Sequence, residues 1–220
     1  MNTMLRRRAM MAGAEPSPLV FYDKLVFDGT AYIATDLIPQ ADSSFAVIIG
    51  EETVKGFQAY FSMKAGTNAY TAVNLGTNST STRRYFSVFY GSTSALSTNK
   101  YIAWSNTFLG FYLTPKKFGW GGATPTSITK GANNPSGPLV IGNNPTGTSA
   151  QPFTGSIGTF YVFDSTAQDV TSYSELVTDY TPYITLRPCT YNGVPGLWYV
   201  EGNRFFGNSG GGSFTVYNLP

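Results

Sequence analysis

Short segments rich in aromatic and β-branched residues recur along this chain about every ten residues, and this spacing restricts its fold more than any other feature. Polar residues stand at alternate places within the segments, as expected for strands with one buried face. Clusters of Gly, Asn, Ser or Thr separate them. The expected strands are Leu19–Phe27, Ala31–Thr35, Phe45–Ile49, Phe57–Met63, Tyr70–Leu75, Tyr85–Tyr90, Tyr101–Trp104, Phe108–Thr114, Leu139–Ile141, Gly155–Phe163, Tyr183–Cys189, Leu197–Val200, Arg204–Phe206 and Ser213–Val216. The pattern predicts an all-β protein, an antiparallel jelly-roll β-sandwich.

One short helix interrupts this series of expected strands. Ser172 and Glu175 have the spacing of a capping box, and Leu176 and Val177 follow them. The helix must end before Pro182. Since no βαβ alternation or heptad repeat occurs, a parallel α/β fold is not expected.

The chain has no His, and it has no Asp or Glu between Thr53 and Phe163. Most enzymes need one of these groups as acid, base or metal ligand. A serine triad and a His- or Cys-based zinc site are therefore excluded, and the glycines at 119–122 lack the lysine of a phosphate-binding loop. The spacing of Asp164, Asp169 and Asp179 matches no calcium loop. We expect no catalysis, no cofactor and no metal.

Charged residues make up only 12% of the chain, about half the usual ~25%. Residues 53–163 carry eight basic groups and no acid, whereas both flanking parts are net negative. We therefore expect the basic middle strands to lie beside the acidic ends. The basic residues occur singly or in pairs, so a nucleic-acid partner is not expected.

Cys189 is the single cysteine, which rules out an internal disulfide. The fold must hold by packing alone, as in a protein assembled in a reducing cytoplasm. No His is present to activate this thiol, so we expect it to be buried and inert.

Residues 1–18 differ from the rest of the chain. Arg6, Arg7 and Arg8 precede a short apolar stretch that contains Met10 and Met11. The apolar stretch is too short for a secretion signal. The chain contains no run of about 18 apolar residues, the length needed to span a membrane. The segment is either a frayed basic terminus or an anchoring arm, extended or helical, that precedes a sandwich domain at 19–220. We prefer the arm, because Met and Arg suit adaptable contacts and Arg binds carboxylates bidentately.

A loop-like stretch at Phe118–Gly137 contains Trp120 among glycines, and Asn143 and Asn144 lie in another expected loop. Sugar sites often combine an aromatic ring with Asn side chains, so these three residues are possible glycan contacts. Trp120 could equally pin its own loop. Trp104 and Trp198 have apolar neighbours and are interpreted as core residues.

Two parts of the chain resemble concanavalin A-like, or laminin-G-like, jelly-roll domains. One is the run from Tyr22 to Asp36; the other is Leu139–Asn144 followed by Pro152–Phe163. The tail from Leu186 is similar to C-terminal β extensions in virion proteins of tailed phages that infect gut Bacteroidales, including the crAss-like group. Such proteins often begin with an arm like Met4–Met11. The middle strands lack the acidic residues of calcium-binding laminin-G domains, so the resemblance implies no metal site in this chain.

The resemblance implies a virion structural protein: a head fibre, capsid decoration protein or adhesion module. It would lie on the virion surface after assembly in the host cytoplasm. Residues 1–18 would bind capsid or other virion proteins, and the body would form a homo-trimer or homo-dimer and contact host surface glycans. The alternatives are a carbohydrate-binding lectin module, a receptor-binding tail fibre domain and a glycan-cleaving enzyme, which would need two facing carboxylates.

Overall fold

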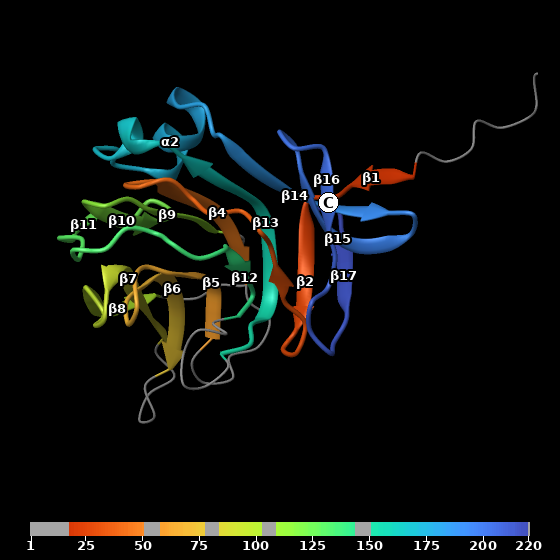
Figure 1. The fold of residues 1–220 in the computed structure, drawn as a ribbon, viewed down its shortest axis with the longest axis horizontal. Coiled ribbons are helices and arrows are strands. Elements are labelled where there is room, and N and C mark those ends of the chain that lie inside the picture. The colour runs from red at the N-terminus through yellow and green to blue at the C-terminus, as the bar shows by residue number, and fades with distance from the viewer. Residues whose placement is uncertain (1–17, 51–57, 78–83, 103–108, 144–150, 220) are drawn as a thin grey trace, which may run out of the picture.

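The computed structural model describes residues 18–50, 58–77, 84–102, 109–143 and 151–219, and these form a jelly-roll-like β-sandwich of two antiparallel sheets (Figure 1). Within these ranges the larger sheet has 11 strands. In spatial order they are β11 (Thr126–Ser127), β10 (Lys117–Trp120), β9 (Leu109–Leu113), β4 (Ser44–Gly50), β13 (Thr154–Phe163), β14 (Ile184–Tyr191), β15 (Val194–Tyr199) and β16 (Arg204–Phe206), with β1 (Leu19–Phe21) beside β14, and β2 (Lys24–Asp28) and then β17 (Phe214–Tyr217) beside β13.

The smaller sheet has six strands among the described residues. Their order is β3 (Ile33–Ala34), β12 (Val140–Ile141), β5 (Gln58–Lys64), β6 (Tyr70–Thr77), β7 (Arg84–Ser92) and β8 (Ser97–Ile102). The predicted fold class is confirmed. Two strands, β10 and β11, fall where the sequence predicted a loop.

Aromatic rings fill the space between the two sheets. Phe61 of the smaller sheet meets Phe160 and Phe45 of the larger one at centroid distances of 5.0 and 5.3 Å. Phe86 meets Phe111 at 4.8 Å. These rings are fully buried. Burial of each of these rings contributes about 1.5–3 kcal/mol, so this layer contributes strongly to the stability of the fold.

The larger sheet divides at β13. One edge of β13 pairs with β4 along Ser156–Phe163. The other edge pairs first with β2, over Thr154–Ile157, and then with β14, over Phe160–Val162. A β-bulge between Ile157 and Phe160 lies at the division, and bulges bend strands in this way.

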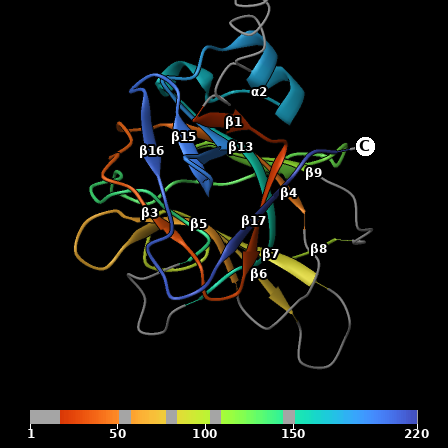
Figure 2. The ribbon, with the colours of Figure 1, turned by 90° about the vertical axis from the view of Figure 1, so that its right-hand side faces the viewer.

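The division creates a second packed region, which we call the C-terminal unit: strands β1, β2 and β14–β17 (Figure 2). Strands β2 and β17 contact β14 and β15. Leu25, Phe27 and Phe214 of the first pair are buried in the same cluster as Leu186 and Leu197 of the second. The unit therefore shares one continuous core with the sandwich.

The helix α2 (Tyr173–Asp179) and the short 3₁₀ helix η1 (Ser165–Ala167) cover the outer face of the larger sheet (Figure 1). Leu176 and Val170 pack there against Ala46 and Phe163. The Ser172 hydroxyl accepts a hydrogen bond from the Glu175 N–H at 3.0 Å, so the predicted N-cap is confirmed. The Glu175 carboxylate returns to the N–H of Thr171 at 2.7 Å, one residue earlier than in the standard box.

Candidate functional site

The residues expected to anchor the chain lie outside the described residues: Arg6, Arg7, Arg8, Met10 and Met11. Asn144 and Trp104 also lie outside them. Among the candidate residues, Trp120 and Asn143 are described.

Trp120 lies on β10 and packs against the core. Its ring stacks on Phe118 at 5.9 Å with an interplanar angle of 28°, and it lies 5.2 Å from Phe86 of the opposite sheet. The side chain is half-buried. The sequence left open a sugar platform or a pin of its own loop; the described contacts of the ring are with Phe118 and Phe86.

Asn143 is 7% exposed and closes a loop. Its carbonyl accepts a hydrogen bond from the Ser62 hydroxyl at 2.9 Å, and its side-chain oxygen accepts one from the Gln151 N–H at 3.0 Å. Asn143 follows β12, whereas Trp120 packs on β7, three strands away and thus about 14 Å across the sheet. Trp120 and Asn143 therefore do not form one site.

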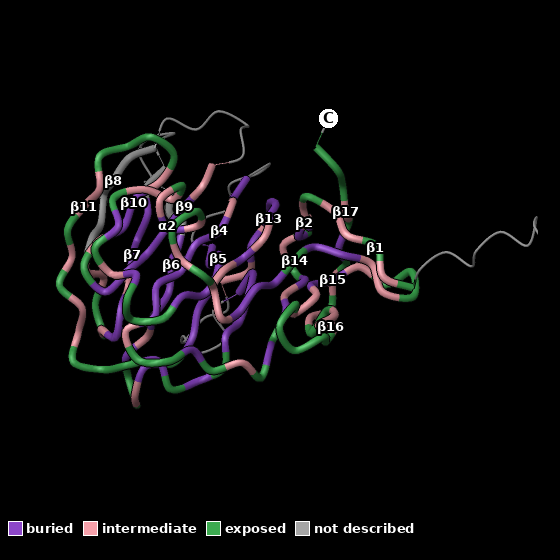
Figure 3. Tube along the Cα trace, turned by 90° about the horizontal axis from the view of Figure 1, so that it is seen from above, coloured by how far each residue is buried: buried purple, intermediate pink, exposed green. Residues whose placement is uncertain are grey.

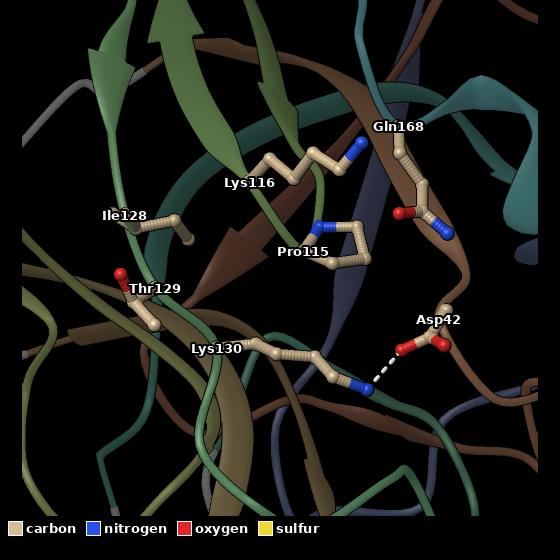
Figure 4. A pocket seen from close by; sticks show the side chains of 7 residues that line it. All are labelled: Asp42, Pro115, Lys116, Ile128, Thr129, Lys130 and Gln168. Carbon is tan, nitrogen blue, oxygen red and sulfur yellow. Dashed lines mark hydrogen bonds and ion pairs between the residues drawn. The ribbon is translucent and has the colours of Figure 1, made fainter.

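A pocket of about 330 Å³ lies where four loop segments meet (Figure 4). This volume is at the lower end of the range for small-molecule sites. Its lining consists of two apolar, two neutral polar and three charged residues: Pro115, Ile128, Thr129, Gln168, Asp42, Lys116 and Lys130.

The turn between β9 and β10 forms one wall. The N–H of Thr114 donates to the carbonyl of Lys117 at 2.7 Å, and Pro115 has the fixed φ that suits such a turn. The Thr114 hydroxyl oxygen accepts from the N–H groups of Lys116 and Lys117 at 3.1 and 2.9 Å. The same hydroxyl donates to the Gln168 carbonyl at 3.0 Å, which fixes the segment after η1 against the turn.

The opposite wall is held by Asp42 and Lys130. Asp42 has φ = 57°, a left-handed conformation that Asp tolerates better than most residues. Its carboxylate forms an ion pair with Lys130, whose ammonium also donates to the Asn134 side chain at 3.1 Å. The Gly131 N–H donates to the Tyr90 carbonyl at 2.7 Å, which fixes this segment to β7.

The lining carries two ammonium groups and one carboxylate. Lys116 donates to both oxygens of Asp169, at 3.0 and 2.8 Å, and these side chains are 51% and 73% exposed. The hydrogen bond from Lys116 holds the pKa of the Asp169 carboxyl below its usual value, so this carboxylate is ionised at neutral pH. Lys116 and Lys130 of the basic middle thus pair with Asp169 and Asp42 of the acidic ends, which confirms the predicted juxtaposition.

A second candidate surface is the outer face of the C-terminal unit, the face of β14 and β15 turned away from Leu186 and Leu197. The strand register places Phe21, Arg187, Tyr191, Trp198 and Phe205 there, and we call these five residues the outer aromatic face. Its rings lie close together: Tyr191 is 5.5 Å from Trp198 and 5.6 Å from Phe205. The Arg187 guanidinium lies 4.2 Å from the Phe21 centroid.

The outer aromatic face corrects one prediction and confirms another. Trp198 is half-buried and absent from the core cluster, so its interpretation as a core residue was wrong. Trp198 pairs with Arg187 and therefore lies on the outer side of β15, opposite to the side of Leu197. Cys189 is fully buried under the same face, as predicted. Burial raises the pKa of its thiol to about 12.

Exposed apolar side chains are concentrated in this unit. Among the described residues, six large hydrophobic side chains are exposed, and five belong to the C-terminal unit or directly follow its strands: Val20, Val194, Val200, Tyr217 and Leu219. Figure 3 shows the contrast, with buried segments dominating the sandwich and half-buried or exposed ones dominating β1 and β15–β17.

Most of the described carboxylates serve structural contacts. Asp28 accepts from three backbone N–H groups, Asp36 pairs with Arg204, and Glu201 accepts from the Thr185 N–H at 2.7 Å. Within the described ranges, no three Cys, Asp or Glu side chains are grouped closely enough to hold a metal ion. Among the described residues, no helix has the length and apolar character needed to cross a bilayer.

Sequence reasoning missed the pocket and the outer aromatic face. The pocket combines residues from positions 42, 115–116, 128–130 and 168, and no local spacing connects them. The turn Thr114-Pro-Lys-Lys117 was the one available signal. The outer aromatic face was missed because register alone decides which side of a strand Trp198 occupies.

Comparison with known proteins yields structural likeness and no sequence family. No family model and no curated protein matches the sequence. A native heptameric SAP-like pentraxin from Limulus polyphemus aligns over 71% of this chain and 81% of its own, with 14% identity and a TM-score of 0.49. The enzymatically active domain of tailspike protein 2 from bacteriophage CBA120 aligns over 78% of this chain and 32% of its own, with 11% identity and a TM-score of 0.43. At these levels the fold assignment rests on the strand pairing described above.

Proposed function

We propose that this chain is a non-catalytic structural and adhesion module of a tailed-phage virion, a head fibre or capsid decoration protein. Residues 1–18 would bind capsid or other virion proteins, and the body would self-associate as a homo-dimer or homo-trimer. The phage assignment is supported by the sequence resemblances of the tail and the arm. Lack of catalysis is supported by the absence of His from the sequence and by the structural contacts of most described carboxylates.

The observation that carries the assembly role is the position of the exposed apolar side chains. Val20 and Val194 are 44% and 53% exposed, and both belong to the C-terminal unit, whose strand β1 follows directly after residues 1–18. Val194 pairs with Tyr191 and lies on the side of the outer aromatic face, whereas Val20 pairs with Thr190 and lies on the other side of the strands. Aromatic and Arg side chains, such as those of the outer aromatic face, are enriched at protein interfaces. An assembly surface in the C-terminal unit would thus be continuous with the attachment of the arm.

The assembly surface is tested by charge substitution. Val194→Asp should weaken self-association at least tenfold, because it places a charge within an apolar contact, while leaving the Tm within about 2 °C. Ile38→Asp is a matched control, since Ile38 is 54% exposed but lies outside the unit. Sedimentation equilibrium measures both variants. A strictly monomeric wild-type protein, or equal effects of the two substitutions, would refute the assembly surface.

The anchoring role of residues 1–18 is tested by incorporation of the chain into virions. Deletion of residues 1–15 should leave a folded body that no longer joins the virion, and replacement of Arg6, Arg7 and Arg8 by Ala should weaken incorporation more than replacement by Lys. Particle-bound protein is measured after gradient purification. Normal incorporation of the truncated chain would exclude the anchor.

A second candidate function, favoured by the pocket, is a lectin module that holds host surface glycans. Sugar sites combine an apolar surface with hydrogen-bonding groups, and Pro115, Thr129 and Gln168 provide both here. A glycan array should show binding by the wild type and loss with Gln168→Ala, with Lys64→Ala as a control on an exposed lysine outside the pocket. An array without any wild-type signal would remove this candidate.

A further inference from the structure

The two ammonium groups of the pocket lie on opposite sides of Pro115. In Figure 4 the Lys116 side chain extends toward Gln168, and the Lys130 side chain extends toward Asp42. Both lysines therefore border the same space, and the formal charge of the lining residues is one unit positive.

Lys116 can exchange its partner at little cost. Asp169, its ion-pair partner, is not part of the lining, and the pair is largely exposed. Exposed ion pairs of this kind contribute little net stability. A carboxylate that enters the pocket can therefore take the place of Asp169 on Lys116 and gain a charge-assisted hydrogen bond in a less hydrated position.

The rest of the lining suits a sugar ring more than a simple anion. Pro115 is buried and Ile128 is half-buried, which gives an apolar surface for the C–H groups of a ring. The Gln168 amide, the Thr129 hydroxyl and the Asp42 carboxylate supply donors and acceptors for ring hydroxyls. The Asp42 carboxylate also disfavours a second negative charge on the ligand. A ligand with one negative charge therefore matches the single net positive charge of the lining.

We propose that this pocket binds a carboxylate-bearing sugar unit of the hexuronic acid class. The proposal rests on the lectin candidate of the preceding section and adds the charge of the ligand. Lys116 holds the ligand carboxylate, Lys130 and Asp42 hold hydroxyls at the opposite wall, and Pro115 with Ile128 supports the ring.

The test uses the full chain and isothermal titration with five probes: methyl glucuronide, methyl galacturonide, the methyl esters of both, and acetate. At least one uronide should bind about tenfold more tightly than its own ester, because the ester keeps the ring but loses the charge. Lys116→Gln should lower affinity for the uronide about tenfold and leave the ester unchanged, while Lys64→Gln should change neither. The uronide affinity should also fall as salt rises.

The contrary outcomes separate the claims. Esters that bind as tightly as the acids, with no effect of Lys116→Gln, would overturn the acidic-sugar proposal and leave the lectin candidate intact. Acetate that binds as tightly as the uronides would overturn the sugar and leave an anion site. No binding of any probe, together with an empty glycan array, would overturn both the proposal and the lectin candidate.

Discussion

The sandwich and the C-terminal unit are built from the same kind of alternating strands, yet they place their aromatic residues differently. In the sandwich, Phe61, Phe86 and Phe160 point between two sheets and are fully buried. In the C-terminal unit, Trp198 and Phe205 lie on an outer face and are half-buried. The difference lies in what covers the second face of each sheet. In the sandwich, η1 and α2 cover the outer face of the larger sheet, whereas no described element covers the outer aromatic face.

The buried rings of the sandwich and the half-buried rings of the C-terminal unit serve different purposes. Buried rings contribute to folding, because they leave water during the folding step itself. Rings that stay half-exposed after folding retain apolar area that a partner can still bury. The same composition thus stabilises one region and equips the other for contact.

The largest expected effect concerns a ring of the sandwich. Phe61→Ala should lower the free energy of unfolding by about 3–5 kcal/mol, since it opens a cavity between the sheets. Phe205→Ala in the outer aromatic face should cost only about 1 kcal/mol. Urea unfolding measures both, and Phe61→Leu serves if the Ala variant does not fold. Equal losses would mean that the two regions do not differ as described.

Alkaline pH should destabilise the sandwich and its helical cover through their buried tyrosines. Burial raises the pKa of Tyr112 to about 12, with a smaller contribution from the Glu175 charge, and burial also raises the pKa values of Tyr90 and Tyr173. A raised native pKa gives stability that is complete below the unfolded value of about 10 and is lost as pH rises above it. Melting temperatures should therefore fall above about pH 10, together with the appearance of tyrosinate absorbance. A flat profile to about pH 11 would contradict this.

Acid should act on the C-terminal unit through Asp28. Burial alone would raise the pKa of this carboxyl, but hydrogen bonds from the N–H groups of Ser213, Thr30 and Ala31 outweigh it and hold the pKa well below its usual value. The resulting stability is present above the unfolded value of about 3.9 and is lost as pH falls below it. Asp28→Asn should cost about 1–2 kcal/mol at neutral pH and flatten the acid dependence.

The control for Asp28→Asn is Asp164→Asn, which removes a carboxylate at the N-cap of η1 in the sandwich. Hydrogen exchange at β17 should increase for Asp28→Asn alone, because Asp28 is the residue that holds Ser213. Faster exchange at β17 in both variants would show that the effect is not local.

The smallest effect is a difference in labelling rate. With a pKa raised from 9.0 to about 12, the thiolate fraction of Cys189 at mildly alkaline pH falls about a thousandfold, and burial also blocks access. Maleimide should modify the native chain at least about a hundredfold more slowly than the denatured chain. Fast labelling of native protein would show that the outer aromatic face opens locally while the sandwich stays folded.

Most strands could be predicted from the sequence, since alternation and turn residues are local signals. Strand β10 is an exception, because the sequence predicted a loop there. Glycines made the region around Trp120 resemble a loop, yet Gly119 lies in β10 because the Tyr112 ring occupies the space of a side chain: a Cβ there would lie 2.6 Å from a Tyr112 ring carbon. Glycine marked a close approach of a ring to the backbone, and the sequence does not distinguish this from a turn.

The sequence by itself determined the class of fold, the N-cap at Ser172, the burial of Cys189 and the proximity of basic middle strands to acidic ends. These follow from periodicity, composition and charge, which act locally or on average. Only the tertiary structure decided where β13 divides the larger sheet, which face Trp198 occupies and which four loops line the pocket. Those features depend on register and on contacts between residues more than a hundred positions apart, for which a linear sequence carries no direct signal.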